Sequence, residues 1–203
     1  MAVSKGNLID TIATWGKYYT IEADITINSY VRQSNHWESI LHFTIGELSK
    51  QFYEMIKSRQ KHLFFVGGDH HGSIPGNRIP GFWAGRNTNR RRLLIASSVG
   101  SSTSYSVYKR LEPGRKYHVL VHQFQHCDGK DYFEVKFNNW SKELVENTNA
   151  QEFSDVKVYA SNPWYNTFDG KLENLVYTNQ GTFYFLEYLV YHVFTVYSTF
   201  SNL

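Results

Sequence analysis

The sequence has one cysteine and little net charge, and each shortage excludes something. Cys127 is the only cysteine in 203 residues, so neither an intrachain disulfide nor a multi-cysteine metal site can form. Lys and Arg total 21 and Asp and Glu total 18, and the resulting net charge of +3 is too small for bulk attraction to nucleic acid. Any electrostatic function must therefore be local. Residues 1–16 lack the apolar run and the small-residue cleavage site of a secretory signal.

Short alternating segments make up most of the chain. From Tyr19 to Ile27, apolar residues at odd positions alternate with polar residues at even positions, as in a strand with one buried face. We predict further strands at 37–45, 77–83, 93–98, 104–109, 117–124, 132–137, 156–159 and 172–177. Turn sequences rich in Gly, Asn, Asp and Pro separate these segments. The pattern predicts a single all-β domain, an antiparallel two-sheet jelly-roll sandwich.

Two regions break the alternation. In 47–66, apolar residues recur at helical spacing among Lys and Glu, which predicts an insertion with one short helix. Residues 182–200 are almost continuously apolar and aromatic, close to the ~20 residues that span a bilayer, but Glu187 and several hydroxyl groups dilute them. We expect a sandwich over 1–178 and an apolar tail over 179–203. The tail fits an extra packed element better than a membrane anchor.

Several separated blocks resemble one family of domains. They are Asn-Arg-Ile-Pro-Gly-Phe-Trp at 77–83, 94–98, 153–159, Asn-Pro-Trp-Tyr at 162–165, and 170–175. In this order they resemble the laminin G-like and concanavalin A-like jelly-roll domains, over about 7–177 of this chain. That fold hosts lectins, adhesion modules and glycosidases, so the resemblance implies an extracellular or cell-surface setting and leaves the activity open.

The same resemblance implies that a calcium ion could be held by loop carboxylates and carbonyl groups. Asp69 and Asp169 are the candidate ligands, but no ligand run with a defined spacing accompanies them. We therefore expect no cofactor. The neighbouring His70 and His71, in a glycine-rich loop, are weak ligand candidates and are more typical of solvated loop residues.

Catalytic and zinc-binding patterns are incomplete. Retaining glucanases of this fold carry Glu-x-Asp-x-x-Glu, and Glu22 and Asp24 supply the first two positions, but Ile27 occupies the third. His118, His122 and His126 are spaced four apart, which is about 13 Å along a strand, whereas zinc ligands lie about 2 Å from one ion. We predict no enzyme activity and no histidine metal site.

Charged and aromatic residues supply the candidate binding site. Its members are Arg86, Arg90, Arg91, Arg92, Trp164 and Tyr165. The arginines lie in a predicted hairpin loop over 86–92, and guanidinium groups suit sulfate, carboxylate and phosphate oxygens. Trp164 and Tyr165 follow Asn162-Pro163 in a loop, where rings can stack on sugars. We assign Trp83 to the core, and Trp15 and Trp37 to lids over it.

These observations favour a non-catalytic recognition module that binds carbohydrate, including sulfated glycans. Two alternatives stay open: a structural or adhesion domain with an extracellular protein partner, and a disfavoured glycoside hydrolase. We expect no nucleic-acid partner, and a membrane partner only if the tail is an anchor. Asn139-Trp140-Ser141 is an acceptor sequon for N-glycosylation at a predicted turn.

Overall fold

The computed structural model describes residues 4–30, 37–45, 76, 78–87, 90–180 and 192–193. These residues form an all-β sandwich. Its strands are β1 (Leu8–Trp15), β2 (Tyr18–Ile27), β3 (Trp37–Thr44), β4 (Gly81–Asn87), β5 (Arg90–Val99), β6 (Ser102–Lys109), β7 (Lys116–Gln125), β8 (Asp131–Phe137), β9 (Trp140–Glu146), β10 (Phe153–Ala160), β11 (Asn166–Thr167), β12 (Gly170–Gln180) and β13 (His192–Val193).

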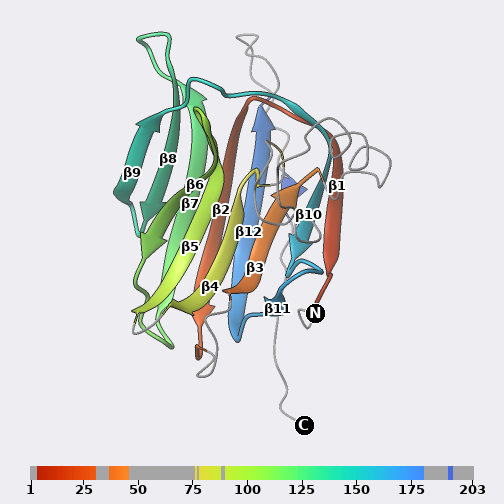
Figure 1. The fold of residues 1–203 in the computed structure, drawn as a ribbon, viewed down its shortest axis with the longest axis vertical. Coiled ribbons are helices and arrows are strands. Elements are labelled where there is room, and N and C mark those ends of the chain that lie inside the picture. The colour runs from red at the N-terminus through yellow and green to blue at the C-terminus, as the bar shows by residue number, and fades with distance from the viewer. Residues whose placement is uncertain are drawn as a thin grey trace, which may run out of the picture.

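Two sheets face each other across the core. The seven-stranded sheet has the order β1-β10-β3-β4-β5-β6, with β11 beside β3, and the six-stranded sheet has the order β13-β12-β2-β7-β8-β9. Every pairing is antiparallel except the two-residue contact of β11 with β3. Figure 1 looks onto the flat side of the sandwich, with β8 and β9 at one edge and β1 and β10 at the other. The predicted two-sheet sandwich is confirmed.

Alternation in the sequence becomes alternation in burial. Along β2, Tyr19, Ile21, Ala23, Ile25 and Ile27 are buried, and the residues between them are partly exposed. The same period-two pattern runs along β7. Their inward residues meet those of β3, β4, β5 and β10 in one hydrophobic core that also contains Trp15. Burial of these faces is the main driving force for the fold.

Some elements differ from the prediction. Residues 8–15 form a strand, β1, and residues 140–146 form β9; neither was among the predicted strands. Strand pairing of β4 with β5 continues to Asn87 and Arg90, so the turn is narrower than the predicted loop over 86–92. Asp128-Gly129, Asn138-Asn139 and Pro113-Gly114 do form turns, and Gly114, Gly129, Asn138 and Asn139 have positive φ there.

Two predicted segments fall largely outside the described residues. The insertion over 47–66 lies entirely outside them, as does most of the tail over 179–203. Within the tail, β12 extends to Gln180, and His192 and Val193 pair with Tyr177 and Val176. In the described parts of the chain, no helix is long and apolar enough to cross a membrane.

Candidate ligand-binding face

The outward side of the seven-stranded sheet carries a cluster of aromatic rings that is separate from the main core. Trp83, Leu94 and Ala96 form its buried centre, and Trp37 and Tyr165 pack against it. The predicted burial of Trp83 is confirmed, but the ring lies in this second cluster and not between the sheets. Trp37 is half-buried here, whereas Trp15 is a fully buried member of the main core.

Two glycines on β4 let the rings lie close to the sheet. A Cβ on Gly81 would come within 2.1 Å of the Trp83 ring, and a Cβ on Gly85 within 2.3 Å of the Trp37 ring. Any other residue at either position would therefore displace an indole. Trp83 lies between these glycines on the same strand, so Gly-x-Trp-x-Gly builds an aromatic floor.

Further rings continue this floor toward β10. The His42 ring centroid lies 5.2 Å from that of Trp83 and 5.8 Å from that of Trp164, in edge contacts. Tyr159 extends the row, with its centroid 6.0 Å from that of Trp164. We name the set of Trp37, His42, Trp83, Tyr108, Tyr159, Trp164 and Tyr165 the aromatic face.

A buried asparagine positions the loop part of this face. Asn162 Oδ1 accepts hydrogen bonds from the backbone N–H groups of Trp164 and Tyr165, at 3.2 and 3.0 Å. This fixes the amide orientation, so Nδ2 is the group 2.9 Å from His42 Nδ1 and donates to it. His42 Nδ1 is therefore an acceptor, and the neutral ring carries its proton on Nε2. The loop that carries Trp164 and Tyr165 is thus held by a satisfied polar network.

Cations lie against the same rings. The Arg78 guanidinium is 4.8 Å from the Trp83 ring centroid, and Arg78 Nη1 donates to Ser104 Oγ. Burial raises the pKa of Tyr165, and the nearby Arg78 partly offsets this rise. At the other end, Arg92 lies 5.3 Å from the Tyr108 ring centroid, and Tyr108 is 41% exposed. In both contacts, the ring face holds the guanidinium group of the chain's own arginine by a cation–π interaction.

The strands beneath these cations contain no acidic residue. No Asp or Glu occurs from His70 to Leu111, a stretch that includes β4, β5 and β6. The same stretch contains Arg78, Arg86, Arg90, Arg91, Arg92, Lys109 and Arg110. These three strands are neighbours in the sheet, so the positive charge is local although the protein is nearly neutral.

The predicted ligand residues are brought together only in part. Trp164 and Tyr165 lie on the aromatic face, and Arg92 lies beside Tyr108 on the same face. Arg86 of β4 pairs with Arg91 of β5, and Arg90 pairs with Asn87. The structure does not describe the side chains of these three arginines. Sequence reasoning missed His42, Arg78, Tyr108 and Tyr159. The alternation of Gly81, Trp83 and Gly85 was the signal that marked this side of the sheet.

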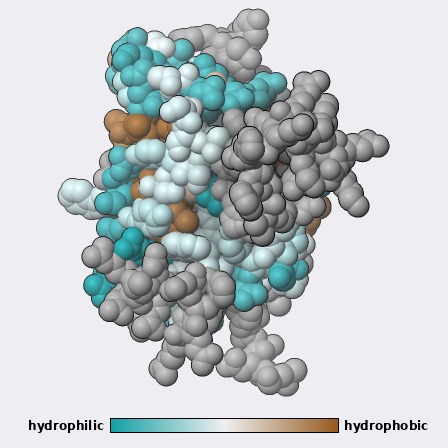
Figure 2. Space-filling model, viewed as in Figure 1, coloured by the Kyte–Doolittle hydropathy of each residue, from teal (hydrophilic) through white to brown (hydrophobic). Residues whose placement is uncertain are grey.

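The view in Figure 2 shows no broad hydrophobic area among the described residues; most of their surface is pale or teal, with small brown spots.

The six-stranded sheet carries a different outward surface. Asp24 accepts a hydrogen bond from Asn174 Nδ2 at 2.8 Å and lies 3.0 Å from His118 Nδ1. Lys116 Nζ is 2.8 Å from Glu173, and Glu22 is 3.9 Å from His118 Nε2. Glu22 and Asp24 thus belong to a cross-strand ladder of charges. Among the described residues, no three His, Cys, Asp or Glu side chains form a group able to hold a metal ion.

The remaining predicted residues lie elsewhere. Asp169 accepts hydrogen bonds from Ser29 Oγ at 2.5 Å and from Asn28 Nδ2 at 3.2 Å, at the start of β12. Asp69, His70 and His71 lie outside the described residues. Asn139 is exposed at the turn between β8 and β9.

Comparison with known proteins supports the fold. A heptameric SAP-like pentraxin from Limulus polyphemus has a TM-score of 0.50 and 12% identity, over 89% of this chain and 76% of that one. An alginate lyase, Aly36B, has a TM-score of 0.40 and 13% identity, over 86% of this chain and 75% of that one. No protein family model and no curated protein matches the chain. The jelly-roll sandwich is thus shown, and membership of the laminin G-like family is not.

Proposed function

We propose that this protein is a non-catalytic carbohydrate-recognition module that binds acidic glycans on its aromatic face. The observation that carries the proposal is the meeting of three features on one side of one sheet. These are rings seated on glycines, a loop fixed by Asn162, and neighbouring strands that contain cations without carboxylates. Rings would pack on the C–H faces of sugars, and guanidinium groups would pair with sulfate or carboxylate oxygens.

The likeness to solved structures shows the fold alone, so the proposal rests on this chain's own residues. An extracellular or cell-surface setting belongs to the same proposal, because sulfated and acidic glycans occur there. We propose no reaction for this chain, since Glu22 and Asp24 lie in a charge ladder on the other sheet.

Heparin affinity chromatography on the full chain, together with a glycan array, tests the proposal. We expect retention on heparin that falls as salt rises, because exposed charges are screened over about 8 Å at physiological ionic strength. Arg92→Ser and Trp164→Ala should each lower the eluting salt concentration. Tyr132→Ala, on the outward side of the six-stranded sheet, is the matched aromatic control and should elute with the parent.

Two results would contradict the proposal. One is elution of the Arg92→Ser and Trp164→Ala variants at the parent's salt concentration. The other is a glycan array on which the protein binds no acidic glycan. Capture of a protein partner by the same face would then favour the adhesion alternative.

A further inference from the structure

The free edge of β9, the last strand of the six-stranded sheet, is a second surface that can bind a partner. Figure 1 shows β9 as the outermost strand at one side of the sandwich. Two exposed large hydrophobic side chains lie on this strand: Trp140 is 81% exposed and Leu144 is 54% exposed. A strand edge with exposed apolar side chains is a place at which another strand can pair.

The backbone hydrogen bonds of β9 show which of its groups are directed to the free edge. The N–H of Asn147 donates to the carbonyl of Asp131 at 2.7 Å, so the backbone groups of Asn147 are directed to β8. Adjacent residues of a strand direct their backbone groups to opposite sides, so those of Glu146 and Leu144 point away from β8. Of the strands that the structure describes, only β8 pairs with β9. A further strand could therefore bond to Glu146 and Leu144.

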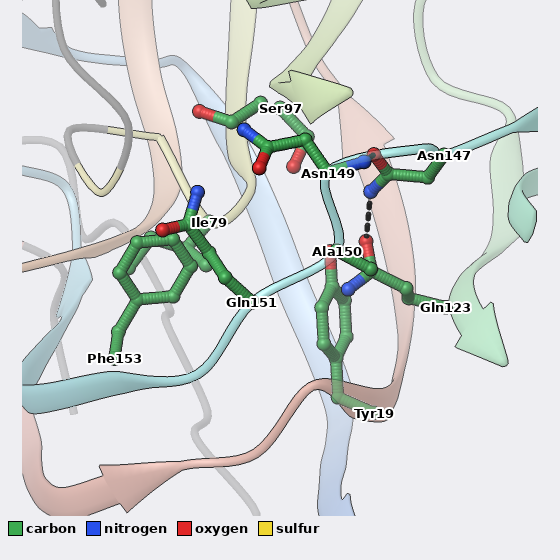
Figure 3. Close-up of a pocket in the computed structure, with 10 residues that line it drawn as sticks. Tyr19, Ile79, Ser97, Gln123, Asn147, Asn149, Ala150, Gln151 and Phe153 are labelled. Carbon is green, nitrogen blue, oxygen red and sulfur yellow. Dashed lines mark hydrogen bonds between the residues drawn. The ribbon is translucent and has the colours of Figure 1, made fainter. Parts of the chain in front are cut away.

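Buried contacts hold the end of β9 in place. Asn147, which directly follows the strand, is 1% exposed. Its Nδ2 donates to Gln123 Oε1 at 2.7 Å, the contact drawn in Figure 3, and its Oδ1 accepts from the backbone N–H of Gly100 at 2.7 Å. Gln123 Nε2 in turn donates to the carbonyl of Lys17 at 2.5 Å. The edge is thus ordered before a partner arrives, which lowers the entropic cost of pairing.

The side chains of β9 are complementary to those of a second β9. Lys142, Leu144 and Glu146 alternate along the strand and are all exposed, so they share the outward side of the sheet. In an antiparallel pair centred on Leu144, the two leucines lie opposite each other, and Lys142 of each copy lies opposite Glu146 of the other. Opposite charges in such positions stabilise a pair of strands. Glu146 Oε2 is 2.7 Å from Lys130 Nζ, which leaves Oε1 for a second cation.

The charges of β9 select this register over its neighbours. Pairing centred on Lys142 would place two lysines opposite each other, and pairing centred on Glu143 or on Glu146 would place two glutamates opposite each other. Pairing centred on Val145 would set Leu144 against Glu146 and form no ion pair. Of these registers, only the one centred on Leu144 opposes unlike charges. Charges on an edge strand commonly prevent pairing, whereas here they specify one pairing.

We infer that this protein forms a two-fold symmetric dimer in which β9 pairs with β9 of a second copy. The two Leu144 residues would exchange backbone hydrogen bonds, and the two six-stranded sheets would become one. Each exposed Trp140 would lie beside the end of the other copy's β9, and aromatic rings of this kind often contribute strongly to binding at interfaces.

The symmetry of this dimer also places its two aromatic faces. The two-fold axis of such a pair is perpendicular to the sheet, so both aromatic faces would lie on the same side of the dimer. That consequence for glycan binding rests on the proposed function. The dimer itself does not, because the aromatic face shares no residue with β9.

Sedimentation velocity of the full chain, over micromolar to millimolar concentrations, tests the dimer. We expect a mass that rises with concentration to twice the 23.7 kDa of one chain. Leu144→Lys sets two ammonium groups against each other at the centre of the interface and should raise the dissociation constant by about tenfold or more. Leu8→Lys is the matched control, because Leu8 is 48% exposed on β1, the edge strand of the other sheet. It should associate like the parent.

A charge-reversal pair tests the register. Lys142→Glu should raise the dissociation constant about tenfold, because it replaces two attractions by two repulsions. Adding Glu146→Lys to Lys142→Glu restores unlike charges across the interface and should recover affinity, which a merely structural role would not predict. These variants carry the test if Leu144→Lys does not fold. Hydrogen exchange at the Leu144 amide should also become slower as the protein concentration rises.

Four results would overturn the inference. A parent that keeps the mass of one chain at every concentration would show that this edge does not bind a second copy. Unchanged association of both Leu144→Lys and Lys142→Glu would place the interface elsewhere, and weaker association of Leu8→Lys would place it at β1. Failure of Glu146→Lys to recover affinity would exclude this register. None of these outcomes depends on heparin binding, so this inference and the proposed function can fail separately.

Discussion

Glu38 is a buried carboxyl group whose charge should make stability depend on pH. It is 6% exposed and lies opposite Ala84 of β4, on the inward side of β3. Burial, and then the negative charge of Asp169, raises the pKa of Glu38 from 4.5 to about 7. The folded protein therefore binds more protons than the unfolded chain between these two pH values. The contribution of protonated Glu38 to stability is complete below pH 4.5 and is lost as the pH rises to about 7.

Glu38→Gln should remove this dependence. At pH 8 the variant should have the larger free energy of unfolding, by up to about 3 kcal/mol, since one pKa unit corresponds to about 1.4 kcal/mol. At pH 4 the two proteins should be nearly equal. Urea unfolding at a series of pH values measures the difference. Glu152→Gln, at an exposed position, is the control and should follow the parent at every pH. Parallel curves for parent and Glu38→Gln would show that Glu38 is not perturbed.

The end of β12 anchors the first hairpin of the sandwich. Asn179 Nδ2 donates to the carbonyl of Thr14, and Asn179 Oδ1 accepts from the backbone N–H of Gly16. Because a hydrogen bond typically contributes about 1 kcal/mol, a chain that ends at Thr178 should be less stable than one that ends at Gln180 by about 2 kcal/mol. Both chains lack β13, so its loss cancels. Denaturant unfolding of the pair measures the difference.

A point variant separates the side chain from the strand end. Asn179→Ala in the chain that ends at Gln180 should reproduce most of the loss of stability, because it removes both side-chain hydrogen bonds. It keeps the pairing of residues 179 and 180 with Tyr19 and Tyr18, so the loss is assigned to the side chain. Equal stability of all three chains would show that the contacts of Asn179 do not contribute.

The sequence predicted central strands better than edge strands. β2 and β7 pair on both sides and bury one face, so their alternation is strict. β1 and β9 lie at sheet edges, and each pairing contains a register shift. A bulge shifts the period of two, and an edge strand exposes residues on both faces, which hides the pattern.

Of the aromatic face, only Trp164 and Tyr165 were predicted as ligand residues, together with Arg92, which lies beside Tyr108. Its other rings come from strands that are distant in sequence and become neighbours only through the order β10-β3-β4. Local patterns carry no information on that order. The alternating pattern around Trp83 is the same whether that side of the sheet packs on the main core or on a second cluster. The burial of Trp83 could therefore be predicted, but not the cluster to which it belongs.

The two outward surfaces of the whole molecule differ in chemistry, and this separates the proposed binding face from the sequon. Acid-free strands and rings lie on one sheet, while the other carries the charge ladder and, at its β8 to β9 turn, Asn139. Asn139 is exposed and has a φ of 67°, so a glycan attached there would extend into solvent from the edge of the six-stranded sheet.

Secretion from animal cells behind an added signal tests this arrangement. The protein should gain the mass of one N-glycan, and Asn139→Gln should abolish the gain, because Asn139-Trp140-Ser141 supplies the acceptor at an accessible turn. Since the glycan would lie on the other sheet, the glycosylated protein and Asn139→Gln should elute from heparin at the same salt concentration. An unmodified parent would show that the turn is not accessible during secretion, and weaker heparin retention of the glycosylated form would place the binding surface near Asn139 and away from the aromatic face.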